Sequence, residues 1–502
     1  MSHKPVVFSR RIRLSPPHPG DKTADVDRLL AALETEGLAG VSIPIDLVRR
    51  LPGELRRQGF EIDLVIGAFG KDLAAVDCGL RRIFGIALDI GSTNMECSLF
   101  DLGTGERLLV REAENPQISF GSDVLTRVQE SMTGRFEPLV RALRDGVNRL
   151  IGEVCVLGGA AREEIVAVTV AGNTIMTHFF LGLDVNNIPL SPYIPVVNSP
   201  VFLTGREAGL VMNGNGLVYV FPNAGSYVGG DIISGIIASD VDREESPVLF
   251  IDVGTNVEVT LGCSDWIMTG AGAAGPALEG GVAGIGKKAE PGTICKVSID
   301  RTTGTVESEV IPGPDSGTSP QGICGSGLID LVAEMFHAGI IDQTGKFTDT
   351  AAGIVERDGV RAFTVYRSGD TELLLTENEI KNFLVSKAAM FSFLYVFVRS
   401  VGLTFSDIRK VFVAGALGCG IDPERAVRIG LLPDIPRERF IPVGNSSLAG
   451  AEMVLLDRDL LTRVERVASM VTYREMNEDS DLMSVLQGAM FIPHTDPELL
   501  RG

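Results

Sequence analysis

The chain has 502 residues, of which 45% are hydrophobic, so it is long enough to bury more than one core. Its formal net charge of −20 at pH 7 would repel a phosphate backbone, and no long block of Lys and Arg offsets it. Apolar runs such as Val248 to Ile251 and Val411 to Ala416 are strand-length, far short of the roughly 20 residues that span a bilayer. We therefore expect a cytoplasmic protein of two or three globular units, with neither nucleic acid nor membrane as a partner.

The first 83 residues form a compositionally separate piece. The apolar spacing predicts helices over 25–36 and 44–58 and a strand over 62–66. This order predicts a small α+β domain.

From Phe84 onward the sequence pattern changes and predicts a strand, a turn and a second strand. The run Ile86 to Leu88 leads into Asp-Ile-Gly-Ser-Thr-Asn at 89–94. The pattern recurs where 248–251 lead into Asp-Val-Gly-Thr-Asn at 252–256, so the two acidic residues are 252 − 89 = 163 positions apart. This self-similarity predicts two like-folded halves, each opening with a β-hairpin that carries an Asp and a Gly at its tip.

An Asp at a strand end beside a glycine turn predicts a phosphate site. Gly91 and Gly254 permit close approach of phosphate oxygens to the backbone. Asp89 and Asp252 are the predicted catalytic residues, which would hold Mg²⁺ largely through water or orient an attacking water. Further hydrogen bonds to the phosphates are expected from Ser92, Thr93, Asn94, Thr255 and Asn256. We expect the two hairpins to face each other and clamp a triphosphate.

Three further glycine-rich junctions join a strand to a helix. The strand 411–414 runs into a small-residue loop, in which we expect Gly415, Ala416 and Gly418 to contact a nucleoside. The stretch 322–327 opens an apolar helix, whose free N–H groups at Gly325, Ser326 and Gly327 favour an anion or a sugar hydroxyl. The stretch 444–451 starts another helix with very small residues, as a close helix crossing would require.

In chain order, these segments resemble the signature of the ASKHA superfamily, which contains acetate kinase, sugar kinases, heat-shock chaperones and actin. The matching segments are the hairpins at 89–94 and 252–258, the connecting helices at 228–240 and 444–455, and the adenosine loop at 412–420. The resemblance implies an α/β, actin-like (ribonuclease H-like) duplicated fold behind a small N-terminal α+β domain, with ATP and Mg²⁺ as cofactors.

The same resemblance implies four parts. A linker and small middle domain would occupy 1–83, a first subdomain 84–242 and a second subdomain 243–442. The helices of 443–502 would return to the first subdomain.

A finer resemblance is to the ATP-dependent reductive activators of corrinoid proteins. It is carried by Asn115 to Gln117, Gly121 to Val124 with Arg127, Gly172 to Met176, Pro192 with Tyr193 and Pro195, Ala273 to Gly280, Gly322 to Asp330, and Phe491 to His494. This resemblance implies ATP-driven delivery of one electron to the Co(II) form of a corrinoid methyltransferase protein, which restores Co(I) for methyl transfer. A homodimer would also suit the family.

The chain departs from that family in its cysteines, because typical members carry an iron–sulfur domain. Its seven cysteines include no Cys-x-x-Cys pair, which predicts reduced, mostly buried thiols and no iron–sulfur cluster in this chain. We therefore expect an external ferredoxin-like electron donor. A smaller departure is Gly-Lys-Lys-Ala at 286–289, where the resemblance leads us to expect Gly-Met-Arg-Ala, so Lys288 places a point charge where a planar arginine fork is expected.

Two other functions remain open at this stage. A kinase acting on a small metabolite could use the same two hairpins, but would need a catalytic Asp in a substrate pocket, and the sequence singles out none. A non-redox ATP-dependent switch or scaffold is the second alternative. Two further features favour structural roles: His178 is expected to be a packed imidazole, and 391–398 to be core.

Overall fold

The computed structural model describes residues 3–254, 257–272, 281, 283–300, 304–313, 319–349, 351–357, 359–369, 371–415, 420–476 and 480–501. The chain divides into two compact units. Unit 1 comprises Met1–Ala238 and Ser446–Met470, and unit 2 comprises Ser239–Asn445 and Val471–Gly502. Each unit has its own cores and is described by itself.

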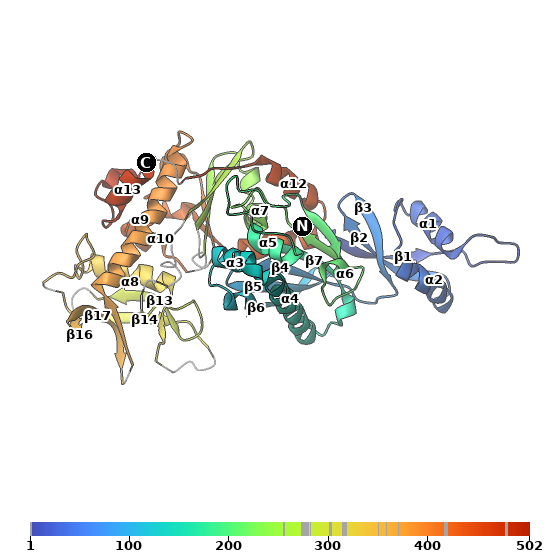
Figure 1. The fold of residues 1–502 in the computed structure, drawn as a ribbon, viewed down its shortest axis with the longest axis horizontal. Helices are drawn as coiled ribbons and strands as arrows, with labels where there is room; N and C mark the ends of the chain where they lie inside the picture. Colours follow the sequence, from blue (N-terminus) through green and yellow to red (C-terminus); the bar gives the residue numbers. More distant parts are fainter. Residues whose placement is uncertain are drawn as a thin grey trace. The chain divides into compact units, whose positions relative to one another are not determined.

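Unit 1 begins with a three-stranded antiparallel sheet of order β1-β2-β3, against which two helices pack (Figure 1). The elements are β1 (Val7–Arg13), α1 (Asp25–Thr35), α2 (Ile45–Arg57), β2 (Glu61–Phe69) and β3 (Asp72–Cys78). Leu47, Leu51 and Leu55 recur every fourth residue of α2 and are fully buried, which gives the helix its sheet-facing stripe. The predicted small α+β domain is confirmed.

A six-stranded sheet of order β6-β5-β4-β7-β9-β8 forms the centre of unit 1. Its strands are β4 (Phe84–Ile90), β5 (Asn94–Asp101), β6 (Glu106–Glu114), β7 (Ile165–Gly172), β8 (Val201–Thr204) and β9 (Leu217–Val220). Strands β4, β5 and β6 are antiparallel, whereas β7 runs parallel to both β4 and β9. Every residue of β7 is buried, as expected for a central strand with both faces covered.

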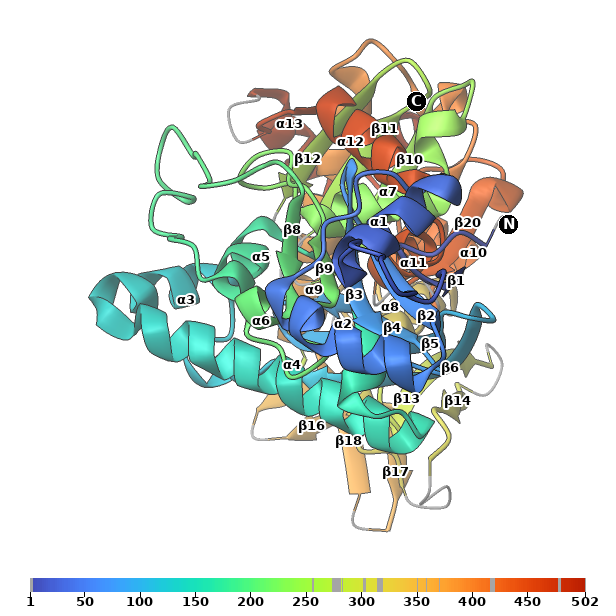
Figure 2. The same cartoon turned by 90° about the vertical axis from the view of Figure 1, so that its right-hand side faces the viewer.

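Helices cover both faces of this sheet. Besides α1 and α2, the helices of unit 1 are α3 (Val124–Glu130), α4 (Phe136–Gly158), α5 (Thr174–Leu181), α6 (Gly205–Ala208), α7 (Gly230–Ser239), α11 (Ser446–Leu456) and α12 (Leu460–Met470). The long helix α4 (Figure 2) buries Leu139, Leu143 and Leu150 in one core with residues of β4 and β7. On the opposite face, the Thr169 hydroxyl of β7 donates to the Ala451 carbonyl of α11 at 2.9 Å.

The sheet of unit 2 repeats this arrangement. Its order is β20-β19-β10-β11-β12-β21, with β10, β11 and β12 antiparallel and β19 parallel to β10 and β20. The strands are β10 (Val248–Val253), β11 (Val257–Gly262), β12 (Ile267–Gly272), β19 (Val411–Gly415), β20 (Phe440–Gly444) and β21 (Val471–Tyr473). Three antiparallel strands followed by parallel neighbours thus occur once in each unit, which is the duplication that the two Asp-Gly motifs predicted.

In the part that the structure describes, unit 2 also contains two small sheets and four α-helices. The sheets have orders β14-β13-β15 and β16-β17-β18. The elements are β13 (Thr293–Ile299), β14 (Val306–Val310), β15 (Gly322–Ile323), β16 (Ile354–Arg357), β17 (Val360–Ser368), β18 (Thr371–Thr376), α8 (Gly325–His337), α9 (Glu377–Arg399), α10 (Pro423–Arg428) and α13 (Ser480–Ala489). Across the two units, the short 3-10 or π turns are η1 (Pro116–Ser119), η2 (Ser131–Arg135) and η3 (Arg162–Glu164) in unit 1, and η4 (Val241–Arg243), η6 (Phe405–Asp407), η7 (Arg437–Arg439) and η8 (Pro497–Leu500) in unit 2.

Helix α9 is the central helix of unit 2. Among the described residues it alone is long and apolar enough to cross a membrane by length and composition, yet 72% of its apolar window is buried inside the protein. Phe391, Leu394 and Phe397 lie in the main core of the unit. The prediction that 391–398 are core is confirmed.

The C-terminal segment differs from the expectation. The sequence predicted that 443–502 would return to the first half, but only Ser446–Met470 belongs to unit 1. Strand β21 pairs with β12, and α13 packs on α9. The buried ammonium of Lys387 also donates to the carbonyls of Ala489 (2.6 Å), Phe491 (2.9 Å) and Pro493 (2.6 Å). These contacts hold 471–501 to unit 2.

Candidate functional site

The first predicted phosphate site lies at the end of the β4–β5 hairpin. Asp89 pairs with Glu96 across the two strands, and Ile90 pairs with Met95, so the tip consists of 91–94. A Cβ at Gly91 would lie 2.5 Å from the backbone oxygen of Asn94, so this turn admits only glycine. The hairpin therefore brings together Asp89, Gly91, Ser92, Thr93 and Asn94 in unit 1.

Asp89 is oriented by a residue that the sequence did not single out. The hydroxyl of Ser447, at the start of α11, donates to the Asp89 carboxylate at 2.7 Å. The Ser447 carbonyl in turn accepts a hydrogen bond from the Ser234 hydroxyl of α7 at 2.6 Å. A Cβ at Gly450 would lie 2.1 Å from the Ser234 carbonyl oxygen, so α7 and α11 cross closely, as the small residues of 444–451 predicted.

The second hairpin, β10–β11, carries Asp252 in unit 2. Asp252 pairs with Glu258 on β11 and lies beside Ala414 of the parallel strand β19. The next residue, Gly415, has φ +77°, and a Cβ there would lie 2.4 Å from an Asp252 carboxylate oxygen. The backbone that opens the predicted adenosine loop therefore contacts the predicted catalytic carboxylate directly.

Part of the predicted site falls outside the described residues. Gly254 is at the described edge of the second tip. The predicted site residues Thr255, Asn256, Ala416 and Gly418, and the family-like stretch 273–280, lie outside the described ranges.

The glycine-rich start of α8 lies in the same unit. The Ser326 hydroxyl donates to the Cys295 carbonyl at 3.2 Å, and a Cβ at Gly420 would lie 3.0 Å from that hydroxyl oxygen. The end of the adenosine loop is therefore adjacent to the first turn of α8. Gly325 and Gly327 are buried, and a Cβ at Gly327 would lie 2.7 Å from the Ile294 carbonyl, so close packing on β13 also requires glycine there.

The Gly-Lys-Lys-Ala stretch adjoins the same region. The Lys287 backbone N–H donates to the Ile323 carbonyl at 2.9 Å, and Gly286 forms a parallel bridge with Ile323. A Cβ at Gly322 would lie 2.4 Å from Cγ of Lys287. Lys287, which precedes the position where the family resemblance led us to expect an arginine (Lys288), therefore lies against the glycine-rich stretch before α8.

Two buried ionisable groups, one in each unit, are structural. On α8, burial raises the pKa of the Asp330 carboxyl to about 6, while its ion pair with Arg425 of α10 acts in the opposite direction. In unit 1, the His178 imidazole is fully buried and accepts hydrogen bonds from the backbone N–H groups of Val196 (3.1 Å) and Val197 (3.4 Å). His178 is thus a packed imidazole, as predicted.

Metal-ligating side chains do not cluster in the described part of the chain. No group of three or more His, Cys, Asp or Glu residues there could hold a metal ion. The described cysteines are free thiols, all buried except Cys295, which is half-buried, in agreement with the prediction of reduced, mostly buried thiols. A strand-end carboxylate beside a glycine turn fits a Mg²⁺ ion that keeps most of its waters and is bridged to phosphates, since such an ion needs few protein ligands.

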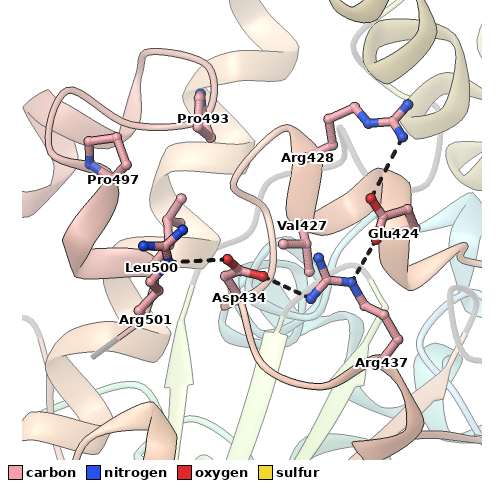
Figure 3. A pocket seen from close by; sticks show the side chains of 9 residues that line it. All are labelled: Glu424, Val427, Arg428, Asp434, Arg437, Pro493, Pro497, Leu500 and Arg501. Atoms are coloured by element: carbon pink, nitrogen blue, oxygen red, sulfur yellow. Dashed lines mark hydrogen bonds and ion pairs between the residues drawn. The ribbon is translucent and has the colours of Figure 1, made fainter.

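A separate hollow of about 240 Å³ lies in unit 2, and Figure 3 shows its charged lining. Arg437 donates to Glu424 at 2.8 Å and to Asp434 at 2.9 Å, and Arg501 contacts Asp434 at 3.5 Å. Arg428 lies 3.7 Å from Glu424. Each arginine of the lining is already paired with a carboxylate, and no site residue predicted from the sequence lies there, so this hollow is not the nucleotide site.

The duplicated sheets, the two Asp-Gly hairpins and the closely crossing helices α7 and α11 define an ASKHA-type, actin-like fold. Family models cover nearly the whole chain: the RACo linker region matches 1–82, the RACo middle region matches 84–244, and the C-terminal domain of RACo, the ASKHA domain, matches 246–501. The chain belongs to the RACo family. The middle region of that family thus matches from residue 84, not within 1–83 where the resemblance placed it.

Similar proteins carry consistent names. A solved structure named "Reductive activator for corrinoid,iron-sulfur protein" matches with a TM-score of 0.91 and 36% identity, covering 99% of this chain and 81% of that chain. "Corrinoid activation enzyme RamQ" of Eubacterium limosum is 30% identical over 80% of this chain and 68% of its own length. "[Co(II) methylated amine-specific corrinoid protein] reductase" of Methanosarcina barkeri is 24% identical over 78% of this chain and 73% of its own length. The predicted resemblance to reductive activators is confirmed.

Proposed function

We propose that this chain is an ATP-dependent reductive activator of a corrinoid protein. The chain would promote transfer of one electron from an external donor to cobalt, so that Co(II) becomes Co(I) and the donor loses one electron. The observation that carries the proposal is the near-complete structural likeness, with a TM-score of 0.91, to a reductive activator for a corrinoid protein. The kinase and scaffold alternatives are not favoured, because the named relatives are activators and reductases of corrinoid proteins.

The residues of the two hairpins fit an ATP site. The glycine tip 91–94 would offer backbone N–H groups to phosphate oxygens, and Asp89, held by Ser447, would face the hydrated cation or the attacking water. In unit 2, Asp252 would act in the same way from the second hairpin, with Gly254, Thr255 and Asn256 at its tip. The binding and hydrolysis of ATP would supply the free energy that makes the reduction favourable.

The remaining residues would hold the nucleoside. Gly415 lies beside Asp252 at the start of the predicted adenosine loop, to which Ala416 and Gly418 would also belong, and Gly420 lies next to Ser326 in the first turn of α8. We further propose a cytoplasmic location, a homodimer, a corrinoid methyltransferase partner, and a ferredoxin-like donor outside this chain, in line with its dispersed cysteines.

The test is an anaerobic mixture of the chain, Mg-ATP, a one-electron reductant and a corrinoid protein in its Co(II) state. We expect ATP-dependent growth of the Co(I) absorption band. Asp89→Asn and Asp252→Asn should each lower ATP turnover by about a hundredfold or more, since each removes a group that positions the reacting atoms. Co(II) that stays unreduced with ATP, or variants that hydrolyse ATP at the wild-type rate, would overturn the proposal. Proteins that co-purify with the chain from native extract would identify the corrinoid partner.

A further inference from the structure

Three consecutive carbonyl groups at the tip of the first hairpin accept hydrogen bonds from residues outside the hairpin. The Asn115 side-chain amide donates to the Gly91 carbonyl at 2.8 Å. The Arg127 guanidinium donates to the Ser92 carbonyl at 2.6 Å, and the Asn115 backbone N–H donates to the Thr93 carbonyl at 2.8 Å. Both residues lie after β6, outside the hairpin itself.

These contacts fix the direction of the neighbouring N–H groups. In a trans peptide the C=O of one residue and the N–H of the next point in opposite directions. Because the carbonyls of Gly91 and Ser92 point toward Asn115 and Arg127, the N–H groups of Ser92 and Thr93 point away from them. The carbonyls of the turn are therefore engaged by Asn115 and Arg127, and the N–H groups of Ser92 and Thr93, directed away from these partners, are available to an anion.

Arg127 is an unusual residue to find in this position. Its side chain is fully buried, and among the described residues it forms no ion pair with a carboxylate. Its other contacts are the Gly121 carbonyl at 2.9 Å and the Met176 sulfur at 3.5 Å. Burial lowers its pKa, but an arginine remains protonated in proteins, so a positive charge lies directly behind the tip.

The acidic group that acts electrostatically on Arg127 is Asp123, which raises the Arg127 pKa but makes its own hydrogen bonds elsewhere. Asp123 caps α3, and its carboxylate accepts from the Thr126 N–H at 2.9 Å and from the Thr126 hydroxyl at 2.6 Å. A buried charge without a paired opposite charge is costly in free energy. A negatively charged group bound at the tip would offset that cost.

We propose that Arg127, together with Asn115, is a positioning residue for the phosphates of the nucleotide: it aims the amides of the tip and places positive charge behind them. The inference rests on the proposed function, in which this hairpin binds the phosphates of ATP. It adds to that function a pair of residues that touch the hairpin and need not touch the nucleotide.

The experiment compares the affinities of Arg127→Met, Arg127→Lys and Asn115→Ala for Mg-ATP and for adenosine, measured by calorimetry on the full chain. We expect Arg127→Met to weaken Mg-ATP binding at least tenfold and adenosine binding less than twofold, because adenosine has no phosphate. Arg127→Lys, which keeps the charge and loses the fork, should lie between the wild type and Arg127→Met. The control is Arg149→Met, which removes the same charge from an exposed site on α4 and should leave both affinities unchanged.

Each possible result either supports or overturns the role proposed for Arg127. Mg-ATP affinity of Arg127→Met within twofold of the wild type, or equal losses for Mg-ATP and adenosine, would overturn the inference while leaving the proposed function intact. A wild-type chain that binds no Mg-ATP would overturn the proposed function and the inference with it. If Arg127→Met does not fold, Arg127→Lys and Asn115→Ala decide by the same comparison of Mg-ATP with adenosine.

Discussion

Gly415 combines a left-handed backbone conformation with close contact to the proposed catalytic carboxylate of Asp252. Its φ of +77° disfavours any side chain, and a Cβ would also collide with Asp252. We expect Gly415→Ala to lower stability by about 1–2 kcal/mol from the backbone alone and to lower ATP turnover more than tenfold by displacing Asp252. Thermal unfolding and ATPase assays would measure both effects.

Gly402 provides the matched control for that substitution. It has the same φ of +77° in unit 2, but a Cβ added there would meet no heavy atom within 4 Å. Gly402→Ala should therefore show the backbone strain without loss of turnover. If both variants lose turnover equally, the contact between Gly415 and Asp252 has no part in catalysis.

Ser447 offers a second test at the residue scale. Ser447→Ala removes one hydrogen bond to Asp89, which should cost about 1 kcal/mol of stability. Because Asp89 can then rotate, we expect ATP turnover to fall about tenfold. Ser469→Ala, which removes a hydroxyl that donates to the Arg466 carbonyl on α12, is the control and should retain full turnover. A wild-type rate in Ser447→Ala would show that Asp89 needs no such support.

The sequence predicted single residues where chemistry and local conformation coincide. Asp89 and Asp252 each stand at a strand end before a glycine turn, a pattern visible within six residues. The partners of these groups were not predicted, because Ser447 is 358 positions from Asp89 and Arg127 is 35 positions from Ser92. Serine at a helix start and arginine in a short helix are ordinary residues, and only the folded chain shows what they contact.

Among the elements, α9 carries a group whose charge depends on pH. The Lys387 ammonium is fully buried, and burial lowers its pKa to about 7. The unfolded chain therefore binds one more proton than the folded chain between pH 7 and about 10.4, so this group makes stability rise with pH there, by up to about 1.4 kcal/mol per pH unit. Below pH 7 both states are protonated and this contribution no longer changes.

Unfolding free energies of the wild type and Lys387→Met, measured from pH 7 to 9.5, would test this effect. The wild type should gain stability relative to the variant as the pH increases. His494 on the adjoining segment does not interfere, because burial lowers its pKa from 6.5, below this window. Parallel pH profiles for the two proteins would show that Lys387 titrates at its usual value.

At the scale of elements, the periodic segments were predicted well. The helices expected at 25–36 and 44–58 are α1 and α2, and the helix opening at 322–327 is α8. The sequence wrongly predicted that the whole C-terminal segment packs with the first half, whereas the part after Met470 belongs to unit 2. Its amphipathic pattern shows that α13 must bury one face, but not that this face packs on α9 through the carbonyls that Lys387 binds.

For the whole molecule, the duplication was visible because the same strand–Asp–Gly–strand pattern appears twice. The pairing of β19 with β10 and of β7 with β4 then follows from the general preference of such halves for parallel crossover strands. The small sheets of unit 2 were not predicted. Two of their strands, β14 and β16, are short and largely exposed, so their sequences lack a clear alternation of apolar and polar residues.

The last prediction concerns the origin of the electron. Iron–sulfur clusters are held by several cysteine thiolates close together, whereas the cysteines of this chain are dispersed and, in the described part, form no such group. We therefore expect the yield of Co(I) to equal the electron equivalents of added donor, one per cobalt, whatever the concentration of the chain. The measurement is a titration of donor into chain, Mg-ATP and Co(II) corrinoid protein. A chain that is first reduced, then freed of reductant, and still produces Co(I) in proportion to its own concentration would contradict this, because the chain itself would then store the electron.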